Sequence, residues 1–475
     1  MIKVYLTKKI VLYPLNDVYT LAINGVSGAV DILDQQTYQV IDNMSKEDNA
    51  NIPDEIRIKL QERGYLFENH EEETNLIDRL YQFQRQFIAS RPINFVICPT
   101  YGCNLRCTYC FLRRLHQNME KNIRMNQEQI DATFKAIDTL KSLLGKKGSV
   151  QLFGGEPLLA SNQRIVEEVL VKSRERDMKV SIVTNGVCVH LFKNILAENK
   201  DMIKYVQITL DGPQEIHDQR RIFKKGEGTF FKIIKAVDLL LEMEIRVNLR
   251  VNVDLENVEA SPKLISLMEE KGWSINRNFG SVLAPVTDHL NMKDLSNIGQ
   301  EQDLLVRIQR LFAGDTQYFK DFVSLRTFRV LNHIGNIIEP GGLFQQDVPM
   351  LQYCEANNLE FYVFGPDGFI YGCPESIGRT EFAIGEFYPD FKLDTEKTAL
   401  WKDRSILTIP ECKECNVAAF CGGGCAYSAL NAFGTTRKPA CINSEGTLRA
   451  YLDNARDRIV KNFCTEVTTG VGDDQ

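Results

Sequence analysis

A run of eight residues, Cys103-Asn104-Leu105-Arg106-Cys107-Thr108-Tyr109-Cys110, spaces three cysteines as C-x₃-C-x₂-C. Three thiolates this close together can hold three irons of a [4Fe–4S] cube and leave the fourth iron without a protein ligand, whereas a fourth cysteine would close the site. An iron with an open position is a place for chemistry. A zinc site is the main alternative interpretation of such a triad.

The bulk composition sets the class of protein around this triad. The chain has 475 residues, of which 44% are apolar and 25% charged, as in an ordinary globular protein of several domains. Its net charge of −7 argues against a nucleic-acid surface. We see neither an apolar stretch of about 20 residues nor a basic and apolar leader, so we expect no membrane contact and a cytoplasmic location.

Cysteine usage favours metal over disulfides. The chain has 13 cysteines, ten of which fall into spaced groups. Since the cytosol keeps thiols reduced, a disulfide framework is a poor explanation for a protein without an export signal. Cys98, Cys188 and Cys464 lie outside the groups, and Cys98 is expected to be a small packing residue on an apolar strand.

Residues 1 to about 70 combine short apolar runs with turn residues, as in a small α+β unit. The expected strands are Ile10–Tyr13, Val18–Ile23 and Ala29–Leu33. The expected helices lie near Gln36–Met44 and Pro53–Arg63. The acidic run Glu71-Glu72-Glu73 that follows is expected to be a solvated linker.

From Asn94 to about Pro285 strands alternate with helical periods, which predicts a parallel sheet with right-handed crossovers. The expected strands are Phe95–Cys98, Val150–Phe153, Val180–Val183, Val206–Leu210 and Val247–Val253. Functional residues in such folds lie on the loops after the carboxyl ends of the strands. The cysteine triad, Gly154-Gly155-Glu156-Pro157, Thr184-Asn185-Gly186 and Asp211-Gly212-Pro213 each follow one of the first four strands. Residues 300–340 are expected to be helical.

A second group of cysteines lies near the C-terminus. Thirteen residues, Gly368 and four more residues separate Cys354 from Cys373. The pattern Cys412-x₂-Cys415-x₅-Cys421-x₃-Cys425 follows, and Cys441 comes fifteen residues later. A pair of zinc-ribbon sites is the alternative for this region, since Cys412-x₂-Cys415 alone would suggest one.

The triad, with Tyr109 directly before its third cysteine, resembles the signature of the radical S-adenosylmethionine (SAM) enzymes. The resemblance implies a partial (β/α)₆ barrel related to the TIM barrel, with a [4Fe–4S] cluster on Cys103, Cys107 and Cys110 that binds and cleaves SAM. The GGEP segment of the family holds the SAM amino group, and later strand ends contact its ribose and carboxylate. The implied cofactor-binding residues are Tyr109, Gly154, Gly155, Glu156, Pro157, Thr184, Asn185, Thr209, Asp211, Arg221 and Asn252. A solvent-exposed arginine is the alternative for Arg221.

The seven C-terminal cysteines match the SPASM pattern found in some members of that family, which implies two auxiliary [4Fe–4S] clusters and three clusters in all. By this resemblance Cys354, Cys373 and Cys425 bind the first auxiliary cluster. The second would be bound by Cys412, Cys415, Cys421 and Cys441. Some relatives have an eighth cysteine where this chain has Val348, so the first auxiliary cluster is expected to have an open iron.

The N-terminal unit resembles the winged-helix-like domains that recognise leader peptides in peptide maturases, where the leader adds a strand to a sheet edge. A cap that only shields the barrel is the alternative. The resulting division of the chain has five parts: residues 1–90, the leader-recognition domain and linker; 91–300, the barrel; 301–350, a helical bridge; 351–450, the SPASM domain; and 451–475, a C-terminal helix and tail.

The resemblance implies an enzyme that takes hydrogen from a ribosomally made precursor peptide and closes a thioether between a cysteine sulfur and Cα or Cβ. An external flavodoxin- or ferredoxin-type donor would supply the electron. The alternatives are carbon–carbon or carbon–oxygen cross-linking, epimerisation, and formylglycine formation in a sulfatase. Sulfatase-maturing relatives carry Asp directly after the cysteine equivalent to Cys373, where this chain has Pro374 and then Glu375. A non-enzymatic iron–sulfur or zinc scaffold or electron carrier is a further alternative.

Overall fold

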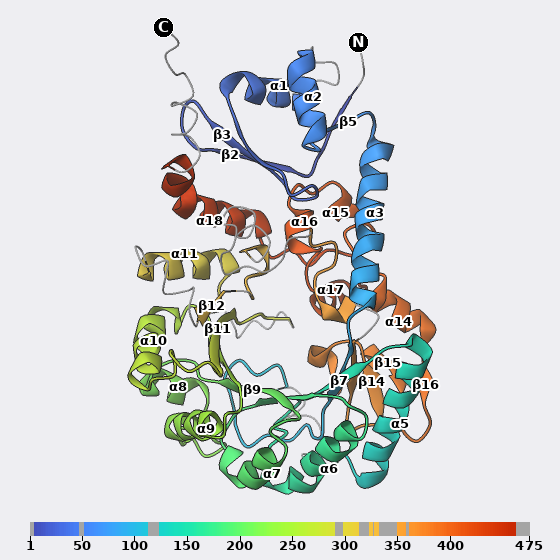
Figure 1. Ribbon diagram of the computed structural model, residues 1–475, viewed down its shortest axis with the longest axis vertical. Helices are drawn as coiled ribbons and strands as arrows, with labels where there is room; N and C mark the ends of the chain where they lie inside the picture. Colours follow the sequence, from blue (N-terminus) through green and yellow to red (C-terminus); the bar gives the residue numbers. More distant parts are fainter. Residues whose placement is uncertain are drawn as a thin grey trace.

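The computed structural model describes residues 4–46, 52–112, 123–289, 298–312, 323–325, 327–331, 349–357 and 361–461. Figure 1 shows a small N-terminal unit at one end of the long axis and a curved sheet ringed by helices at the other. Helices α3 (His70–Ala89) and α18 (Ser444–Ile459) lie between these two ends. None of the described helices is both long and apolar enough to traverse a lipid bilayer.

A run of parallel strands forms the curved sheet, in the order of the sequence. These strands are β6 (Ile93–Ile97), β7 (Gly148–Leu152), β8 (Val180–Thr184), β9 (Ile203–Thr209), β10 (Val247–Val253) and β11 (Phe279–Pro285). Their side chains are buried at most positions, as expected of strands covered on both faces. The predicted α/β fold with a parallel, barrel-like sheet is therefore confirmed, and its sixth strand is β11.

Helices follow the strands and cover the outer face of the sheet (Figure 1). They are α5 (Gln127–Leu144), α6 (Gln163–Arg174), α7 (Lys193–Glu198), α8 (Gln214–Arg220), α9 (Phe230–Glu242) and α10 (Ser261–Glu270). Helix α5 begins at a capping box, in which the side chains of Asn126 and Gln129 each bond the other's backbone amide, and it ends at Gly145 in the left-handed conformation. The apolar stripe of α5, which includes Ile130, Phe134 and Ile137, is buried on the sheet.

Further strands extend both edges of this sheet. On the β11 side lies the short parallel strand β12 (Val323–Ser324). On the β6 side β13 (Phe361–Phe364) pairs in parallel and starts an antiparallel meander that continues through β14 (Phe369–Tyr371), β15 (Ala383–Glu386) and β16 (Lys392–Leu393). The C-terminal part of the chain is thus joined to the barrel by backbone hydrogen bonds.

Among the described residues of the stretch 300–340, α11 (Glu301–Leu311) and residues 329–331 are helical, as expected. Val323 and Ser324 form strand β12 instead, because the open edge of β11 offers hydrogen-bond partners to an apolar segment. Most of the remaining bridge and the tail after 461 lie outside the described residues, as do Val348 and Cys464.

The N-terminal unit contains the predicted three-stranded meander of β2 (Ile10–Pro14), β3 (Thr20–Asn24) and β4 (Val30–Leu33). Helices α1 (Gln35–Lys46) and α2 (Asp54–Glu62) pack with Leu33 and Ala22 on one face. The other face, with Val11 and Leu21, joins the main core that includes residues of α18. A separate pair, β1 (Tyr5–Leu6) with β5 (Leu66–Phe67), completes the unit.

The acidic run at 71–73 is the first turn of α3, so the predicted solvated linker is wrong. Asn69 caps this helix by accepting from the amide of Glu72, and three carboxylates suit the positive end of the helix dipole. Glu73 is only 3% exposed and accepts a hydrogen bond from the hydroxyl of Thr7. The third acidic residue therefore holds the helix to the N-terminal unit.

Short helices dominate the cysteine-rich C-terminal region. They are α14 (Thr395–Lys402), α15 (Pro410–Lys413), α16 (Ala418–Cys421) and α17 (Ala426–Phe433), followed by the long α18. The β3–β4 turn packs against this region, where Val26 shares a core with Ile409 and Ala418.

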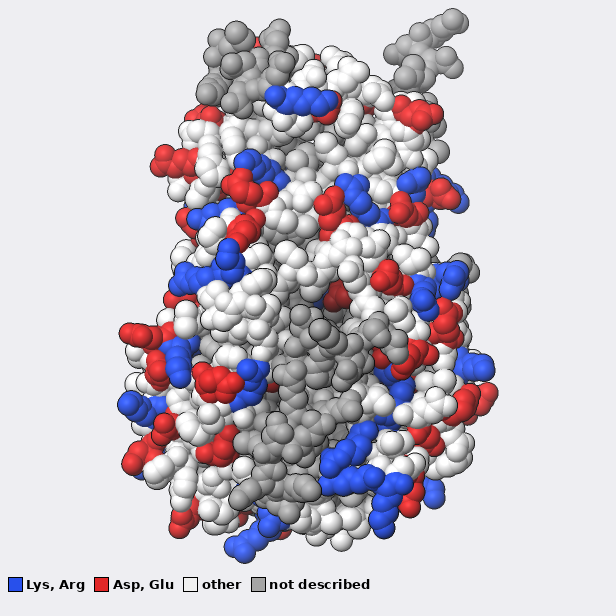
Figure 2. Space-filling view, turned by 180° about the vertical axis from the view of Figure 1, so that it is seen from behind, with Lys and Arg blue, Asp and Glu red and all other residues white. Residues whose placement is uncertain are grey.

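Figure 2 shows the face of the molecule opposite to that in Figure 1. On most of this face, Lys and Arg side chains are interspersed with Asp and Glu side chains.

Gly25 provides a test of this packing. A Cβ at Gly25 would lie 2.9 Å from the ring of Phe420 and 3.0 Å from Cβ of Ala419, so Gly25→Val should destabilise the protein by about 1–3 kcal/mol through overpacking. The measurement is urea denaturation, together with the rate of tryptic cleavage of the N-terminal unit. Gly280→Val, at a position with no neighbouring atom within 4 Å, is the control. Equal effects of the two substitutions would contradict this packing.

Candidate functional site

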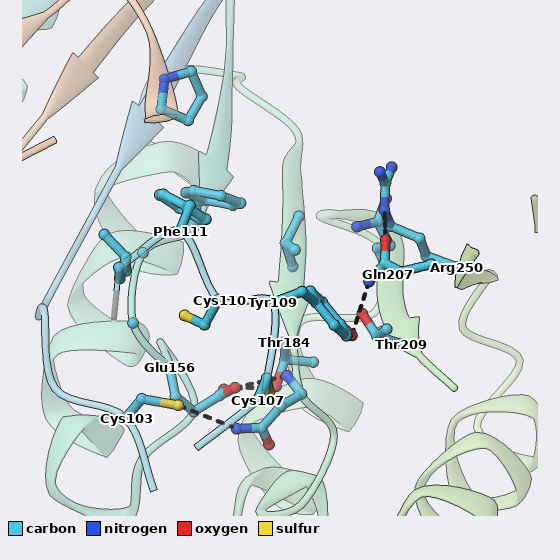
Figure 3. Close-up of a pocket in the computed structure, with 18 of the residues that line it drawn as sticks. Cys103, Cys107, Tyr109, Cys110, Phe111, Glu156, Thr184, Gln207, Thr209 and Arg250 are labelled. Atoms are coloured by element: carbon cyan, nitrogen blue, oxygen red, sulfur yellow. Dashed lines mark hydrogen bonds between the residues drawn. The ribbon is translucent and has the colours of Figure 1, made fainter. Parts of the chain in front are cut away.

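The carboxyl ends of the parallel strands surround a cavity of about 480 Å³. The three cysteines of the triad lie on one side of it, and Figure 3 shows the ring of Tyr109 reaching from their loop toward the strands that carry Thr209 and Arg250. The predicted site residues that line the cavity are Cys103, Cys107, Cys110, Tyr109, Gly154, Gly155, Glu156, Thr184, Asn185, Thr209, Arg221 and Asn252. The structure thus brings together residues from five successive strand ends.

Two glycines allow the triad loop to lie directly on the next loop. The amide of Gly155 donates to the carbonyl of Thr100 at 3.0 Å, and a Cβ at Gly155 would lie 2.2 Å from the carbonyl oxygen of Gly102. Gly154 has φ +122°, and a Cβ there would lie 2.1 Å from Sγ of the buried Cys98. A side chain at either position would collide with neighbouring atoms, and at Gly154 the positive φ also favours glycine.

Glu156 is 1% exposed, and its carboxylate accepts three hydrogen bonds from protein donors, two on Oε1 and one on Oε2. It accepts from the hydroxyl of Thr184 at 2.6 Å, the amide of Asn185 at 2.6 Å and the amide of Leu158 at 2.8 Å. Burial raises the pKa of Glu156, while these three bonds lower it. Glu156 therefore joins the second and third loops of the site and presents an anionic edge to the cavity.

A buried hydrogen-bond network holds Tyr109, the residue directly before the third cysteine of the triad. Its hydroxyl donates to the carboxylate of Asp211 and accepts from Arg221 at 2.7 Å and from the side-chain amide of Asn252 at 3.1 Å. The guanidinium of Arg220 lies over the tyrosine ring, 5.0 Å from its centroid, and is paired with Asp254 at 2.8 Å. The loop between Cys107 and Cys110 is thereby anchored to the fourth and fifth strands.

Arg221 is 7% exposed, so the alternative of a solvent-exposed arginine is wrong. Burial lowers its pKa, but the charges of Cys107, Tyr109 and Asp211 outweigh that effect and raise it. Its Nε is buried without a hydrogen-bond partner among the described residues. A buried guanidinium with an unused donor beside the cavity is suited to bind an anionic group.

Two of the expected contact residues do not line the cavity. Asp211 is 1% exposed and lies behind Tyr109, where it also accepts from the amide of Asn252 at 3.1 Å. Pro157 is buried beside Glu156 and lies outside the lining. Both therefore support residues that line the cavity, because the loops turn away from it after Glu156 and after Thr209.

Another part of the cavity wall contains His289, Pro374 and Glu375, which sequence reasoning did not assign. His289 follows β11, so recognition of this sixth strand would have identified it. Glu375 lies two residues after Cys373, and its Oε2 is buried without a hydrogen-bond partner among the described residues. Burial raises the pKa of Glu375, and the nearby charges of His289 and Arg250 lower it.

Cys354, Cys373 and Cys425 lie close together next to this wall. Burial raises the pKa of Cys373, and the nearby thiols of Cys425 and Cys354 raise it further. A hydrogen bond between Cys425 and His289 raises the pKa of the imidazole against the effect of burial. The thiols therefore form one group that adjoins the cavity through His289 and Glu375.

The second group also comes together. Burial raises the pKa of Cys412 to about 12, and the thiols of Cys421, Cys415 and Cys441 add to this effect because they are nearby. The guanidinium of Arg404 is 2% exposed and donates to the carbonyls of Gly423 at 2.6 Å and Lys438 at 2.8 Å. No carboxylate lies within 4.0 Å of it in the part of the chain that the structure describes.

The donor sets fit iron–sulfur clusters. Thiolates are the ligands of such clusters, and a buried cation with only carbonyl partners needs a negative group nearby, which a thiolate-bound cluster supplies. Among the described residues no three His, Cys, Asp or Glu side chains converge as around a single metal ion. A cube holds its thiolates farther apart than one zinc ion does, since Zn–S distances are about 2.3 Å.

Comparison with known families identifies the domain around the triad. The model of the radical SAM superfamily matches residues 97–267. The chain carries a radical SAM domain. It is therefore a radical SAM enzyme, and the domain uses SAM together with a [4Fe–4S] cluster.

Relatives of this radical SAM enzyme include sulfatase maturases. The cysteine-type anaerobic sulfatase-maturating enzyme of Clostridium perfringens is 26% identical over 349 residues, covering 70% of this chain and 89% of that protein. The serine-type enzyme of Bacteroides thetaiotaomicron is 22% identical and covers 71% of this chain and 83% of that protein.

Two solved structures share its fold. The structure of anSMEcpe with bound AdoMet has a TM-score of 0.60 at 21% identity and covers 81% of this chain and 97% of the other. Streptococcus suis SuiB bound to its precursor peptide SuiA has a TM-score of 0.52 at 16% identity and covers 92% of this chain and 99% of SuiB.

His217, in helix α8 after the fourth strand, supports the Tyr109 network without lining the cavity. Its Nδ1 accepts from the amide of Asp211 at 3.2 Å, and its Nε2 bonds the hydroxyl of Thr229 at 2.9 Å. That hydroxyl donates to the carbonyl of Arg221 at 2.7 Å, so Nε2 carries the proton. Burial, with the charges of Arg221 and Arg220, lowers the pKa of His217 from 6.5 to about 3.

His217 should therefore make the protein acid-sensitive. Above pH 6.5 the imidazole is neutral in both folded and unfolded states; below it, the unfolded chain binds a proton that the folded protein excludes until about pH 3. Stability should fall by about 1.4 kcal/mol per pH unit in this range through this residue. Urea denaturation at pH 7.5 and 5 should show a smaller loss for His217→Gln, by about 2 kcal/mol. The exposed His190→Gln is the control, and equal pH slopes for both variants would contradict the assignment.

Proposed function

We propose that this radical SAM enzyme modifies a ribosomally made peptide, with the peptide bound in the cavity between the cysteine triad and the loop after Cys373. The observation that carries the proposal is the composition of that cavity. Cys103, Cys107 and Cys110 line one part of its wall, and His289, Pro374 and Glu375 line another part. A side chain bound there would lie between the proposed SAM site and the proposed first auxiliary site.

The triad would hold the cluster through three thiolates, and SAM, split by one electron from it, supplies a 5′-deoxyadenosyl radical that takes hydrogen from the peptide. The residues around it would hold SAM by charge. The anionic edge of Glu156 suits the SAM amino group, and the unused donor of Arg221 suits its carboxylate. Thr209 lies near Tyr109 in Figure 3, and Asn252 donates to the hydroxyl of Tyr109, so both offer polar groups beside that ring.

The finer reaction we propose is thioether formation. Hydrogen abstraction leaves a carbon radical on the peptide, a cysteine sulfur bonds that carbon, and the former S–H hydrogen leaves as a proton and an electron. The proposed first auxiliary cluster, held by Cys354, Cys373 and Cys425 with an open iron, would bind the thiolate and accept this electron. The second auxiliary cluster, on Cys412, Cys415, Cys421 and Cys441, and an external flavodoxin- or ferredoxin-type donor complete the electron path.

Formylglycine formation is the second candidate, favoured by a separate observation. Glu375 lines the cavity, its Oε2 has no hydrogen-bond partner among the described residues, and a carboxylate there could accept the proton that this oxidation releases. The sulfatase maturases among the relatives match most of the chain. A thioether, a carbon–carbon or carbon–oxygen cross-link, and formylglycine made from serine all lose two hydrogen atoms, whereas formylglycine made from cysteine also replaces sulfur with oxygen. Tandem mass spectrometry with an aldehyde-reactive probe separates a free aldehyde from a cross-link and locates the bonded residues, and epimerisation leaves the mass unchanged.

The N-terminal unit is proposed to bind the leader of the precursor peptide. Both faces of the β2-β3-β4 sheet are covered, by α1 and α2 on one side and by the main core on the other. Its edges, β2 and β4, pair with no further strand among the described residues. The likeness to SuiB spans 92% of this chain, more than the likeness to anSMEcpe, which supports a peptide-binding N-terminal unit. An added strand would gain main-chain hydrogen bonds at either edge.

Removal of the triad tests the radical site. The variant Cys103→Ala/Cys107→Ala/Cys110→Ala should lose about four irons per chain and all dithionite-driven formation of 5′-deoxyadenosine, because the cluster that cleaves SAM has no ligands. Iron, sulfide and 5′-deoxyadenosine are measured on anaerobic protein. Cys188→Ala, which removes a cysteine outside the groups, is the control. Unchanged cleavage in the triad variant would refute the assignment, and zinc in place of iron would favour the non-enzymatic scaffold.

Hydrogen exchange tests the peptide-binding edge. Addition of a leader-bearing substrate peptide, sought among short reading frames beside the gene, should slow amide exchange in β2 or β4, since their outward N–H groups acquire acceptors. The edge strand β16 of the large sheet is the internal control and should exchange at an unchanged rate. Peptide binding without any protection in either strand would show that the unit is only a cap.

A further inference from the structure

A lysine of the N-terminal unit reaches into the second C-terminal cysteine group. Lys9 is 3% exposed, and its ammonium donates to the carbonyl oxygens of Cys412 at 2.9 Å, Cys415 at 3.1 Å and Lys413. An ammonium has three N–H donors, so each of them has an acceptor. All the acceptors belong to the short segment that runs from Cys412 to Cys415.

The backbone around Lys9 directs the side chain toward that segment. Its amide donates to the hydroxyl of Thr7 at 3.0 Å, and its carbonyl accepts from the amide of Gly25 at 3.3 Å. The same hydroxyl of Thr7 bonds the buried Glu73. Next to the lysine, Val26 packs with Cys412 and the surrounding apolar side chains. The N-terminal unit thus contacts the segment through both an apolar surface and a charge.

The charge of Lys9 lacks a direct counterion. No carboxylate lies within 4.0 Å of its ammonium among the residues that the structure describes, and the opposite charges that act on it come from Glu73, Glu414 and the thiols of Cys415 and Cys412. Burial of an unpaired ammonium is unfavourable by several kcal/mol unless negative charge compensates for it. A cube bound by thiolates supplies such charge, and nearby hydrogen bonds and charges set its reduction potential.

We propose that Lys9 is a positioning residue of the second auxiliary site, so that the N-terminal unit itself completes the site and its ammonium eases reduction of the cluster held there. The inference rests on the iron–sulfur part of the proposed function. Capping of the carbonyl end of α15 is the purely structural alternative, since Lys9 also bonds the last residues of this short helix. A structural cap would affect stability and leave the potential of the cluster unchanged.

The experiment uses the full chain with Cys103, Cys107 and Cys110 replaced by Ala, so that only auxiliary clusters remain. Lys9→Met removes the ammonium and keeps the length of the side chain. Lys8→Met is the matched control, because the exposed Lys8 pairs with Glu414 next to the same segment and its replacement changes the net charge equally. The readouts are iron content and an electron paramagnetic resonance titration of the reduction potential. The signal that disappears in Cys441→Ala identifies the second site.

The expected result is a shift of this potential to more negative values in Lys9→Met and not in Lys8→Met. Loss of about four irons in Lys9→Met alone, with dithionite-driven SAM cleavage retained when the triad is restored, also supports the proposal. Equal iron and equal potentials in the two variants would overturn it. If Lys9→Met loses every cluster, Lys9→Gln decides the question, since it keeps donors for the carbonyls and removes the charge. An unchanged potential in Lys9→Gln overturns the proposal. A chain without iron at the second site before mutation would refute the proposed clusters themselves.

Discussion

The close approach of two loops at the carboxyl edge of the sheet is the contact on which the site depends. The amide of Gly155 meets the carbonyl of Thr100 at 3.0 Å, and the amide of Glu156 meets the carbonyl of Gly102 at 2.9 Å. Backbone bonds of this kind need glycine at 155, where any side chain would collide with the neighbouring carbonyls. The triad loop is therefore attached to the loop of Glu156, and through the bonds of that carboxylate to the third strand end as well. Three of the strand ends act as one unit.

Buried charges complete the arrangement on the other sides. Arg221 and Asp211 hold Tyr109 from the fourth strand end, and their opposite charges compensate each other through its hydroxyl. Lys9 and Arg404 differ from this pattern, since among the described residues the side chain of each donates only to carbonyl oxygens. Both lie at the segments that carry the C-terminal cysteines. Oppositely charged side chains thus lie together beside the cavity of the barrel. The two buried cations without a nearby carboxylate among the described residues lie instead beside the C-terminal cysteines.

Local patterns were sufficient to predict most of the fold. Strands such as Val247–Val253 are apolar and β-branched, and motifs at their ends lie at the cavity because parallel strands end at a common edge. The acidic run at 71–73 was misjudged because its role depends on Thr7, which is distant in the sequence. Residues 323–324 formed a strand because β11 has an open edge, a fact of the tertiary structure.

The same distinction applies to the site. The cysteines, the glycines and Glu156 were identified from spacing, because their chemistry requires fixed local geometry. His289 was missed along with the strand that precedes it, and Glu375 was noticed only as a departure from the sulfatase maturases. The burial of Arg221 and of Lys9 depends on contacts with distant parts of the chain, Tyr109 for the first and Cys412 for the second, and no local pattern encodes it.

The shared sheet has a mechanical consequence. Strand β13 continues the parallel register of β6 from Asn94 to Ile97, and Cys373 follows the β13–β14 hairpin by two residues. Among the described residues, the triad follows β6 and Cys373 follows β14, and both strands belong to one hydrogen-bonded sheet. Electron tunnelling between centres at these positions would occur across a span that thermal motion hardly alters. Its rate would then respond to driving force and to the bound substrate, rather than to the opening and closing of domains.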